Sequence, residues 1–126
     1  MAVWAAVALG GALGSVARYA TMIGVARLVG VGFPYGVLLV NVIGGFVMGV
    51  LVELMVATWS PSDTVRLFLT VGVLGGYTTF SAFSLDVWQL LEQGLYGPAI
   101  VYIVASVVLS VAALVAGLTV TRMALA

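Results

Sequence analysis

Apolar residues dominate four long stretches of this chain, and short polar segments separate them. Each stretch is longer than the ~20 residues that a helix needs to cross a bilayer, so the pattern predicts transmembrane helices. The predicted helices span residues 3–26, 34–58, 65–91 and 98–121. Ser62 or Asp63 is the expected N-cap of the third helix, and Pro98 suits the first turn of the fourth. We therefore predict an all-α membrane protein in which residues 1–126 form one domain of four transmembrane helices.

The composition excludes several classes of protein. Of the 126 residues, 64% are hydrophobic and the mean hydropathy is +1.33, more apolar surface than a soluble domain of this length can bury. Four arginines and four acidic residues give a formal net charge of zero, so no nucleic-acid partner is expected. The chain has no cysteine and no histidine, which excludes disulfides, zinc sites and histidine-based catalytic triads. No enzyme activity is predicted. The first stretch lacks a basic region before it, which favours a retained helix over a cleaved secretory signal.

The third stretch contains a segment that does not suit a continuous helix, GVLGGYTTFSAFSLD at residues 72–86. Gly75 and Gly76 favour leaving helical geometry, and the β-branched Thr78 and Thr79 resist re-entering it. We expect the helix to be broken at Gly75-Gly76. Unpaired backbone groups inside a bilayer cost several kcal/mol each, so such backbone normally lines a cavity or an ion site. The alternative is a glycine kink in a packed helix.

Glycines recur four residues apart in three of the stretches, as the pairs Gly10 with Gly14, Gly45 with Gly49, and Gly72 with Gly76. Small residues at this spacing let membrane helices approach closely, so the pairs predict tight helix packing and self-association.

The arginines give no clear orientation in the membrane. One predicted side carries Arg66 and Arg122, and the other carries Arg27, with Arg18 nearby inside the first helix. Without a bias in positive charge, the positive-inside rule does not choose a topology. Two hypotheses stay open: a single topology set by weak signals, or insertion both ways with two copies paired antiparallel, as in the inverted repeats of larger transporters.

Polar residues within the predicted spans are candidates for a transport path. Arg18 costs roughly 2.5–3.5 kcal/mol in hydrocarbon, so it either forms an electropositive vestibule or extends to the membrane surface. Asn41 lies in the middle of the second span, where a buried amide needs hydrogen-bond partners. It therefore either joins two helices or lines a path. Tyr102, Ser106 and Ser110 lie on one helix face, which favours a polar track over serines bonded to their own helix.

Phe80 and Phe83 share a face beyond the expected break. Two phenylalanines at this spacing are usually core residues, but the positive edges of their rings can also contact a small anion in a narrow pore. Thr79, Ala82 and Asp86 form the neighbouring stripe.

Three segments together resemble the bacterial fluoride channel family, Fluc or CrcB: GGALGSVARY (10–19), GVLLVNVIGGFVMG (36–49) and GVLGGYTTFSAFS (72–84). The resemblance implies an antiparallel, dual-topology homodimer of four-helix subunits in lipid, in the bacterial cytoplasmic (inner) membrane. It also implies two fluoride pores and a central structural sodium ion at the helix break. Fluoride would move passively, and its export would protect the cell from fluoride that entered as the neutral acid.

The resemblance also assigns roles to residues. The carbonyl oxygens of Gly75 and Thr78 would bind sodium, and Arg18 matches the arginine of the family's first helix, as a vestibule charge. The implied anion pathway consists of Asn41, Thr79, Phe80, Phe83, Tyr102, Ser106 and Ser110. The chain departs from the family at three positions: Val37 replaces a frequent Thr, Ala82 a hydroxyl residue, and Asp86 a common Glu.

Two other functions fit a short four-span protein. A small multidrug exporter requires a carboxylate in the first helix, where this chain has Arg18 and no acid. A non-transporting assembly subunit would use the glycine faces for packing only, and it leaves the Tyr102, Ser106 and Ser110 stripe unexplained.

Overall fold

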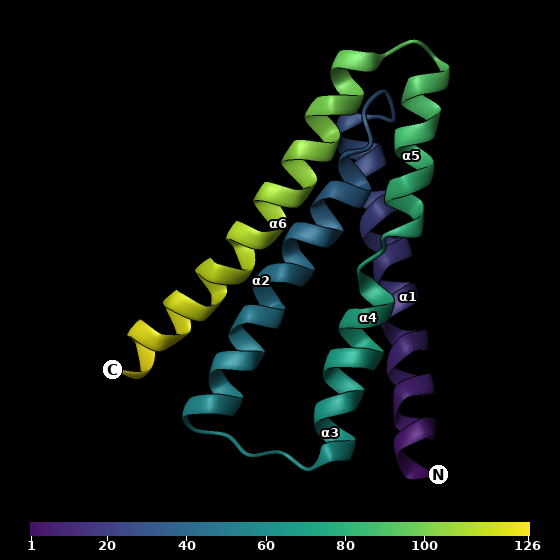
Figure 1. Ribbon diagram of the computed structural model, residues 1–126. Helices are drawn as coiled ribbons and strands as arrows, with labels where there is room; N and C mark the ends of the chain where they lie inside the picture. Colours follow the sequence, from purple (N-terminus) through teal and green to yellow (C-terminus); the bar gives the residue numbers. More distant parts are fainter.

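The computed structural model describes residues 1–126 and is entirely helical, without strands (Figure 1). Four helical spans are long and apolar enough to cross a membrane: Ala2–Val29, Tyr35–Ala57, Asp63–Glu92 and Tyr96–Leu125. The first, second and fourth are single helices, α1 (Ala2–Val29), α2 (Tyr35–Ala57) and α6 (Tyr96–Leu125). The third span consists of α3 (Asp63–Leu67), the π-helix η1 (Phe68–Leu74), α4 (Gly75–Tyr77) and α5 (Ser81–Glu92).

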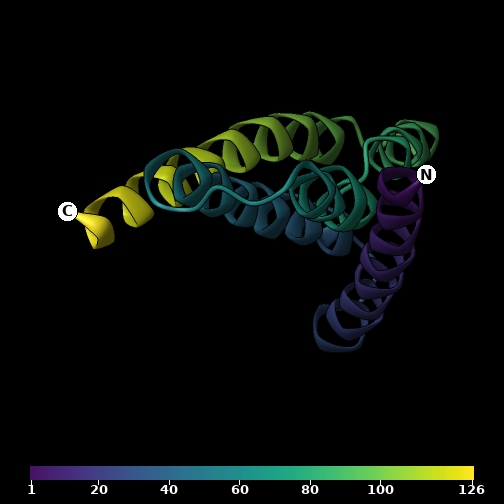
Figure 2. The same ribbon diagram turned by 90° about the horizontal axis from the view of Figure 1, so that it is seen from below.

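The helices pack as two pairs. α2 lies along α6, and α1 lies along η1 and α4 (Figure 1). Viewed from below, α1 and α6 form the outer edges of the molecule and do not contact each other (Figure 2). Both termini and the linker between α2 and α3 lie at one end of the protein, as expected for an even number of spans (Figure 1).

Glycines bring α1 against the third span. A Cβ added at Gly10 would lie 2.6 Å from the carbonyl oxygen of Phe68 and 3.0 Å from the Cα of Gly72. A Cβ at Gly14 would overlap the carbonyl oxygen of Val73. The two backbones therefore touch where no side chain intervenes, which confirms the predicted close packing at this seam.

Glycines also bring α2 and α6 into close contact. A Cβ at Gly45 would lie 2.7 Å from the carbonyl oxygen of Ser110, and one at Gly49 would overlap that of Leu114. At the ends of the two helices Glu53 is buried, and its carboxylate accepts two hydrogen bonds of 3.1 Å from Arg122. This bidentate ion pair links the C-terminal ends of α2 and α6.

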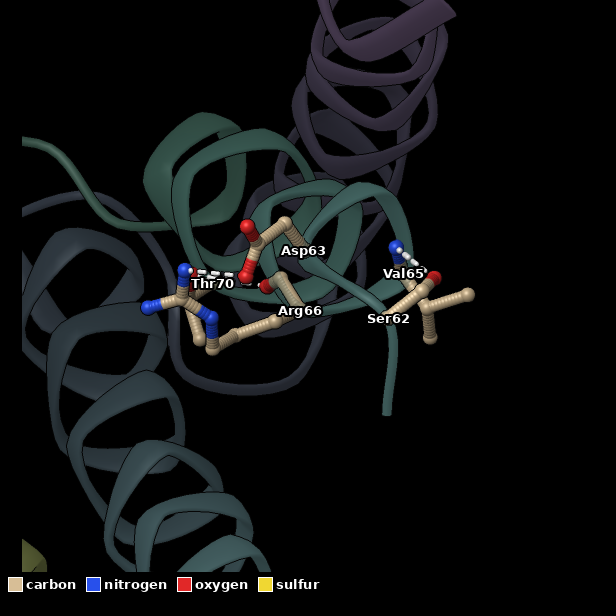
Figure 3. Close-up of polar contacts among 5 residues, drawn as sticks. All are labelled: Ser62, Asp63, Val65, Arg66 and Thr70. Atoms are coloured by element: carbon tan, nitrogen blue, oxygen red, sulfur yellow. Dashed lines mark hydrogen bonds and ion pairs between the residues drawn. The ribbon is translucent and has the colours of Figure 1, made fainter. Parts of the chain in front are cut away.

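Ser62 is the N-cap of α3, which confirms one of the two expected caps. Its hydroxyl accepts a 3.3 Å hydrogen bond from the backbone N–H of Val65 (Figure 3). Asp63 instead accepts a 2.9 Å hydrogen bond from Arg66, one turn later on the same helix (Figure 3). The α1 helix continues to Val29, beyond the predicted end at residue 26, and Gly30 follows it with a positive φ of 78°.

The interruption of the third span does not lie at Gly75-Gly76, where we expected it. Both glycines are helical, and the backbone becomes extended at Thr78, with φ −80° and ψ 159°. The physical reason is that Gly76 serves the seam with α1: a Cβ there would lie 2.6 Å from the carbonyl oxygen of Gly11. The interruption falls instead at Thr78–Phe80, where a neighbouring helix supplies replacement hydrogen bonds.

We predict that Gly14→Ala destabilises the protein by about 1–3 kcal/mol, because the new methyl group overlaps backbone that cannot move freely. Thermal unfolding of the purified protein in detergent measures the effect. Gly24→Ala is the matched control on the same helix, since nothing lies within 4 Å of its Cβ position. Equal melting temperatures for the two variants would contradict the predicted role of the seam.

Candidate functional site

The side chain of Asn41 replaces helical hydrogen bonds at the interruption. Its Nδ2 donates to the carbonyl oxygen of Thr79 at 3.0 Å, and its Oδ1 accepts from the backbone N–H of Thr79 at 2.9 Å. An Asn amide carries two N–H donors, so one of them remains available for another acceptor. The Asn41 side chain therefore joins α2 to the third span and also lines the groove described below.

Several carbonyl oxygens at the interruption lose their helical donors, among them those of Gly75 and Thr78. In a continuous helix, the Gly75 carbonyl would accept from the N–H of Thr79, which here donates to Asn41. Likewise the Thr78 carbonyl would accept from the N–H of Ala82, which donates to the Thr79 hydroxyl at 3.1 Å. These are the two carbonyls that the family resemblance implies as sodium ligands.

Arg18 points toward the interruption. Its Nη1 donates to the carbonyl oxygen of Thr78 across a distance of 3.5 Å, which is long for a hydrogen bond. The side chain is partly buried and forms no ion pair. The guanidinium therefore brings an unneutralised positive charge to the extended backbone.

A groove of about 660 Å³ runs between α2, the third span and α6. It is lined by apolar side chains and by most of the polar residues named above. Eight of its sixteen lining residues were not among the expected site residues: Gly44, Gly45, Met48, Thr70, Leu74, Val107, Val111 and Leu114. Of these, Thr70 could have been recognised as a candidate, because its hydroxyl lies within an apolar stretch. The expected site residues that line the groove are Asn41, Gly75, Thr78, Thr79, Phe80, Phe83, Ser106 and Ser110.

Two serines that line this groove, Ser106 and Ser110, have hydroxyls without a partner. The Oγ atoms of Ser106 and Ser110 are buried and make no hydrogen bond. Other hydroxyls in this protein bond to the carbonyl four residues earlier, as Thr21 does at 2.9 Å, but these two do not. A buried unpaired hydroxyl costs about 1–3 kcal/mol, so the pair favours a polar occupant of the groove.

Tyr102 lies on the same face of α6 as the serines but has a different environment. It is completely buried, and its hydroxyl donates to Oδ2 of Asp86 at 2.9 Å. It does not line the groove. Asp86, which the sequence analysis placed in the stripe with Thr79 and Ala82 and noted as a departure from the family, is thus its hydrogen-bond partner. The sequence could not predict this hydrogen bond, because the position of Asp86 in the sequence does not show which neighbouring helix its side chain faces.

The two phenylalanines are close together but differently exposed. Their ring centroids are 5.4 Å apart, and the Phe83 ring is 5.1 Å from that of Tyr102. Phe83 is 9% exposed and belongs to the core, whereas Phe80 is 77% exposed and projects from the protein. The two rings therefore line the same groove from different environments, one in the core and one at the surface.

Four helical spans of membrane length, three of which line a groove, define a multi-pass membrane protein. The chain belongs to the CrcB family: residues 5–118 match the family described as "CrcB-like protein, Camphor Resistance (CrcB)". It is accordingly a multi-pass protein of the bacterial inner membrane.

Similar proteins carry the name of an ion channel and not of an enzyme. The chain is 52% identical over 121 residues, 96% of each chain, to a protein of Rhodospirillum centenum named "Fluoride-specific ion channel FluC". A protein of Nitrobacter hamburgensis named "Fluoride-specific ion channel FluC 1" is 51% identical over 117 residues, 93% of each chain. A protein of Agrobacterium fabrum, also named "Fluoride-specific ion channel FluC", is 52% identical over 118 residues, 94% of each chain.

We predict that Asn41→Leu destabilises the protein by about 2–5 kcal/mol, because it leaves both the N–H and the carbonyl of Thr79 unpaired. Thermal unfolding in detergent checks this prediction. Thr119→Val is the control, since this exposed hydroxyl bonds only to its own helix, at Val115. A loss no greater than that of the control would show that the interruption does not depend on the amide.

Proposed function

We propose that this chain forms a fluoride-selective channel, through which fluoride leaves the bacterial cell passively. The relatives named as fluoride-specific ion channels support the choice of ion. The observation that carries the proposal is the pair of unpartnered hydroxyls of Ser106 and Ser110 in the groove. Fluoride is a small, strong hydrogen-bond acceptor, so these hydroxyls can replace part of its hydration shell at membrane depth.

Other groups around the groove suit the same ion. The second N–H of Asn41 supplies a further donor, and ring edges of Phe80 and Phe83 carry partial positive charge. The guanidinium of Arg18 would attract an anion to the vestibule. In contrast, α1 contains no carboxylate that could exchange protons for a cationic drug, which disfavours a small multidrug exporter.

We further propose that two copies of the chain pair antiparallel and together enclose two pathways. In a single copy only 17 of 126 residues are buried, and the Phe80 ring at the groove is 77% exposed. A second copy that covered this face would close the groove. The balanced arginines support the antiparallel arrangement, because neither orientation in the membrane is favoured.

The same pairing suits a structural sodium ion at the interruption. The carbonyls of Gly75 and Thr78 lack their helical donors, and a twofold axis would bring four such oxygens together. Carbonyl oxygens are ligands for hard cations, and the absence of an acid from the interruption favours a monovalent ion. The long contact from Arg18 leaves the second lone pair of the Thr78 oxygen available.

Fluoride efflux from liposomes that contain the purified protein tests the function. We expect efflux far above that of protein-free liposomes, independent of any imposed sodium gradient, because the sodium ion does not cross the membrane. Ser106→Ala and Ser110→Ala should each slow efflux by about tenfold or more, the effect of losing a hydrogen bond to a charged species. Ser15→Ala, at an exposed position on α1, is the control.

No fluoride efflux from the wild-type protein would overturn the proposed function. Efflux that followed the sodium gradient would instead identify a coupled transporter.

Labelling of a single introduced cysteine tests the antiparallel dimer. The chain has no native cysteine, so Ser60→Cys in the linker before α3 places one thiol at a known end of the molecule. We expect an impermeant thiol reagent to label this residue from both sides of the membrane. Labelling from one side only would show a single topology.

A further inference from the structure

Tyr77, the last residue before the interruption, is hydrogen-bonded to α1. Its hydroxyl lies 3.0 Å from Oγ1 of Thr21. The hydroxyl hydrogen of Thr21 is already directed to the carbonyl oxygen of Ala17, at 2.9 Å. Tyr77 is therefore the donor and Thr21 the acceptor in the bond between the two helices.

The Tyr77 side chain also reaches toward α2. A Cβ added at Gly44 would lie 3.6 Å from Cδ2 of the Tyr77 ring, an ordinary packing distance. A single side chain thus spans from α2 to α1 at the level of the interruption. Because α1 and α6 do not touch, α1 is otherwise held mainly through its seam with the third span.

Arg18 depends on the position of α1 at this level. Arg18 and Thr21 are three residues apart and so share a face of the helix, while Tyr77 and Thr78 are adjacent in the chain. The Arg18–Thr78 contact, at 3.5 Å, is too long to fix the guanidinium by itself. The Tyr77–Thr21 bond is shorter and lies one turn further along the same face.

We propose that Tyr77 is a positioning residue that, through Thr21, holds the Arg18 guanidinium beside the interruption. This inference rests on the proposed function, in which that charge attracts the anion. Without the bond, the long Arg18 side chain is freer to extend toward water, where its charge is screened from the vestibule. The hydroxyl of Tyr77 therefore sets how strongly the site attracts fluoride and leaves the later steps of permeation unchanged.

Fluoride flux measured over a range of fluoride concentrations tests this proposal. For Tyr77→Phe and for Thr21→Val, we expect the half-saturating fluoride concentration to rise about fivefold, the effect of one lost hydrogen bond. The maximal flux should stay within about twofold of wild type, since the groove hydroxyls are unchanged. Thr21→Ser keeps the acceptor and should restore the wild-type value.

The double variant Tyr77→Phe with Thr21→Val should be no worse than either single variant, because both remove the same bond. Tyr19→Phe is the matched control, as this exposed tyrosine of α1 makes no hydrogen bond. A lower maximal flux with an unchanged half-saturating concentration would show a purely structural role and overturn the proposal, as would loss of assembly in both single variants.

Failure of this inference is distinct from failure of the proposed function. If the wild-type protein carries fluoride and both single variants keep its half-saturating concentration, the positioning role is wrong and the channel assignment stands. If the wild-type protein carries no fluoride, both are wrong.

Discussion

The arrangement around the groove depends on the pair of hydrogen bonds between the Asn41 amide and the peptide group of Thr79. A membrane interior contains no water that could satisfy an interrupted helix, so extended backbone persists there only if another group supplies its hydrogen bonds. The primary amide is well suited to this task because it carries a donor and an acceptor side by side. By satisfying Thr79, it frees the Gly75 carbonyl and allows the third span to change direction.

Close helix packing makes that hydrogen bond geometrically accessible. Gly44 lies three residues after Asn41, on the same face of α2, and the absence of a side chain there lets this helix approach the interruption. At Gly44 a Cβ would overlap the Thr78 methyl group. A larger residue at Gly44 would therefore move α2 away from the interruption and weaken the hydrogen bonds between Asn41 and Thr79.

The charged residues divide into structural pairs and groups free for function. Arg122 is paired with the buried Glu53, and Arg66 with Asp63, so each of these two arginines has an acidic partner within the chain. Arg18 has no acidic partner and lies against the interruption. An unneutralised guanidinium at the extended backbone attracts anions to this part of the protein, in agreement with the proposed fluoride channel.

Local periodicity accounts for what the sequence determined by itself. Some features are properties of nearby residues in the sequence. They are the four apolar stretches of membrane length, the cap at Ser62, the spacing of the glycines, and the shared face of Ser106 and Ser110 on α6. The resemblance of the glycine and Thr-Thr-Phe-Ser segments to a known family was readable for the same reason.

Only the tertiary structure decided where the third span is interrupted and what each polar group contacts. We expected the interruption at Gly75-Gly76, but it lies at Thr78–Phe80, where Asn41 supplies the hydrogen bonds. Asn41 is 38 residues away in the chain, so the local sequence does not reveal this partner. Tyr102 was expected in the anion pathway, but its hydroxyl donates to Asp86 on another helix and the residue does not line the groove. Phe80 and Phe83 are equally apolar, and their different exposure depends on which helices pack beside them. Each of these features depends on a contact between segments that are distant in the sequence. The pattern of apolar residues along one helix does not show which helix packs beside it.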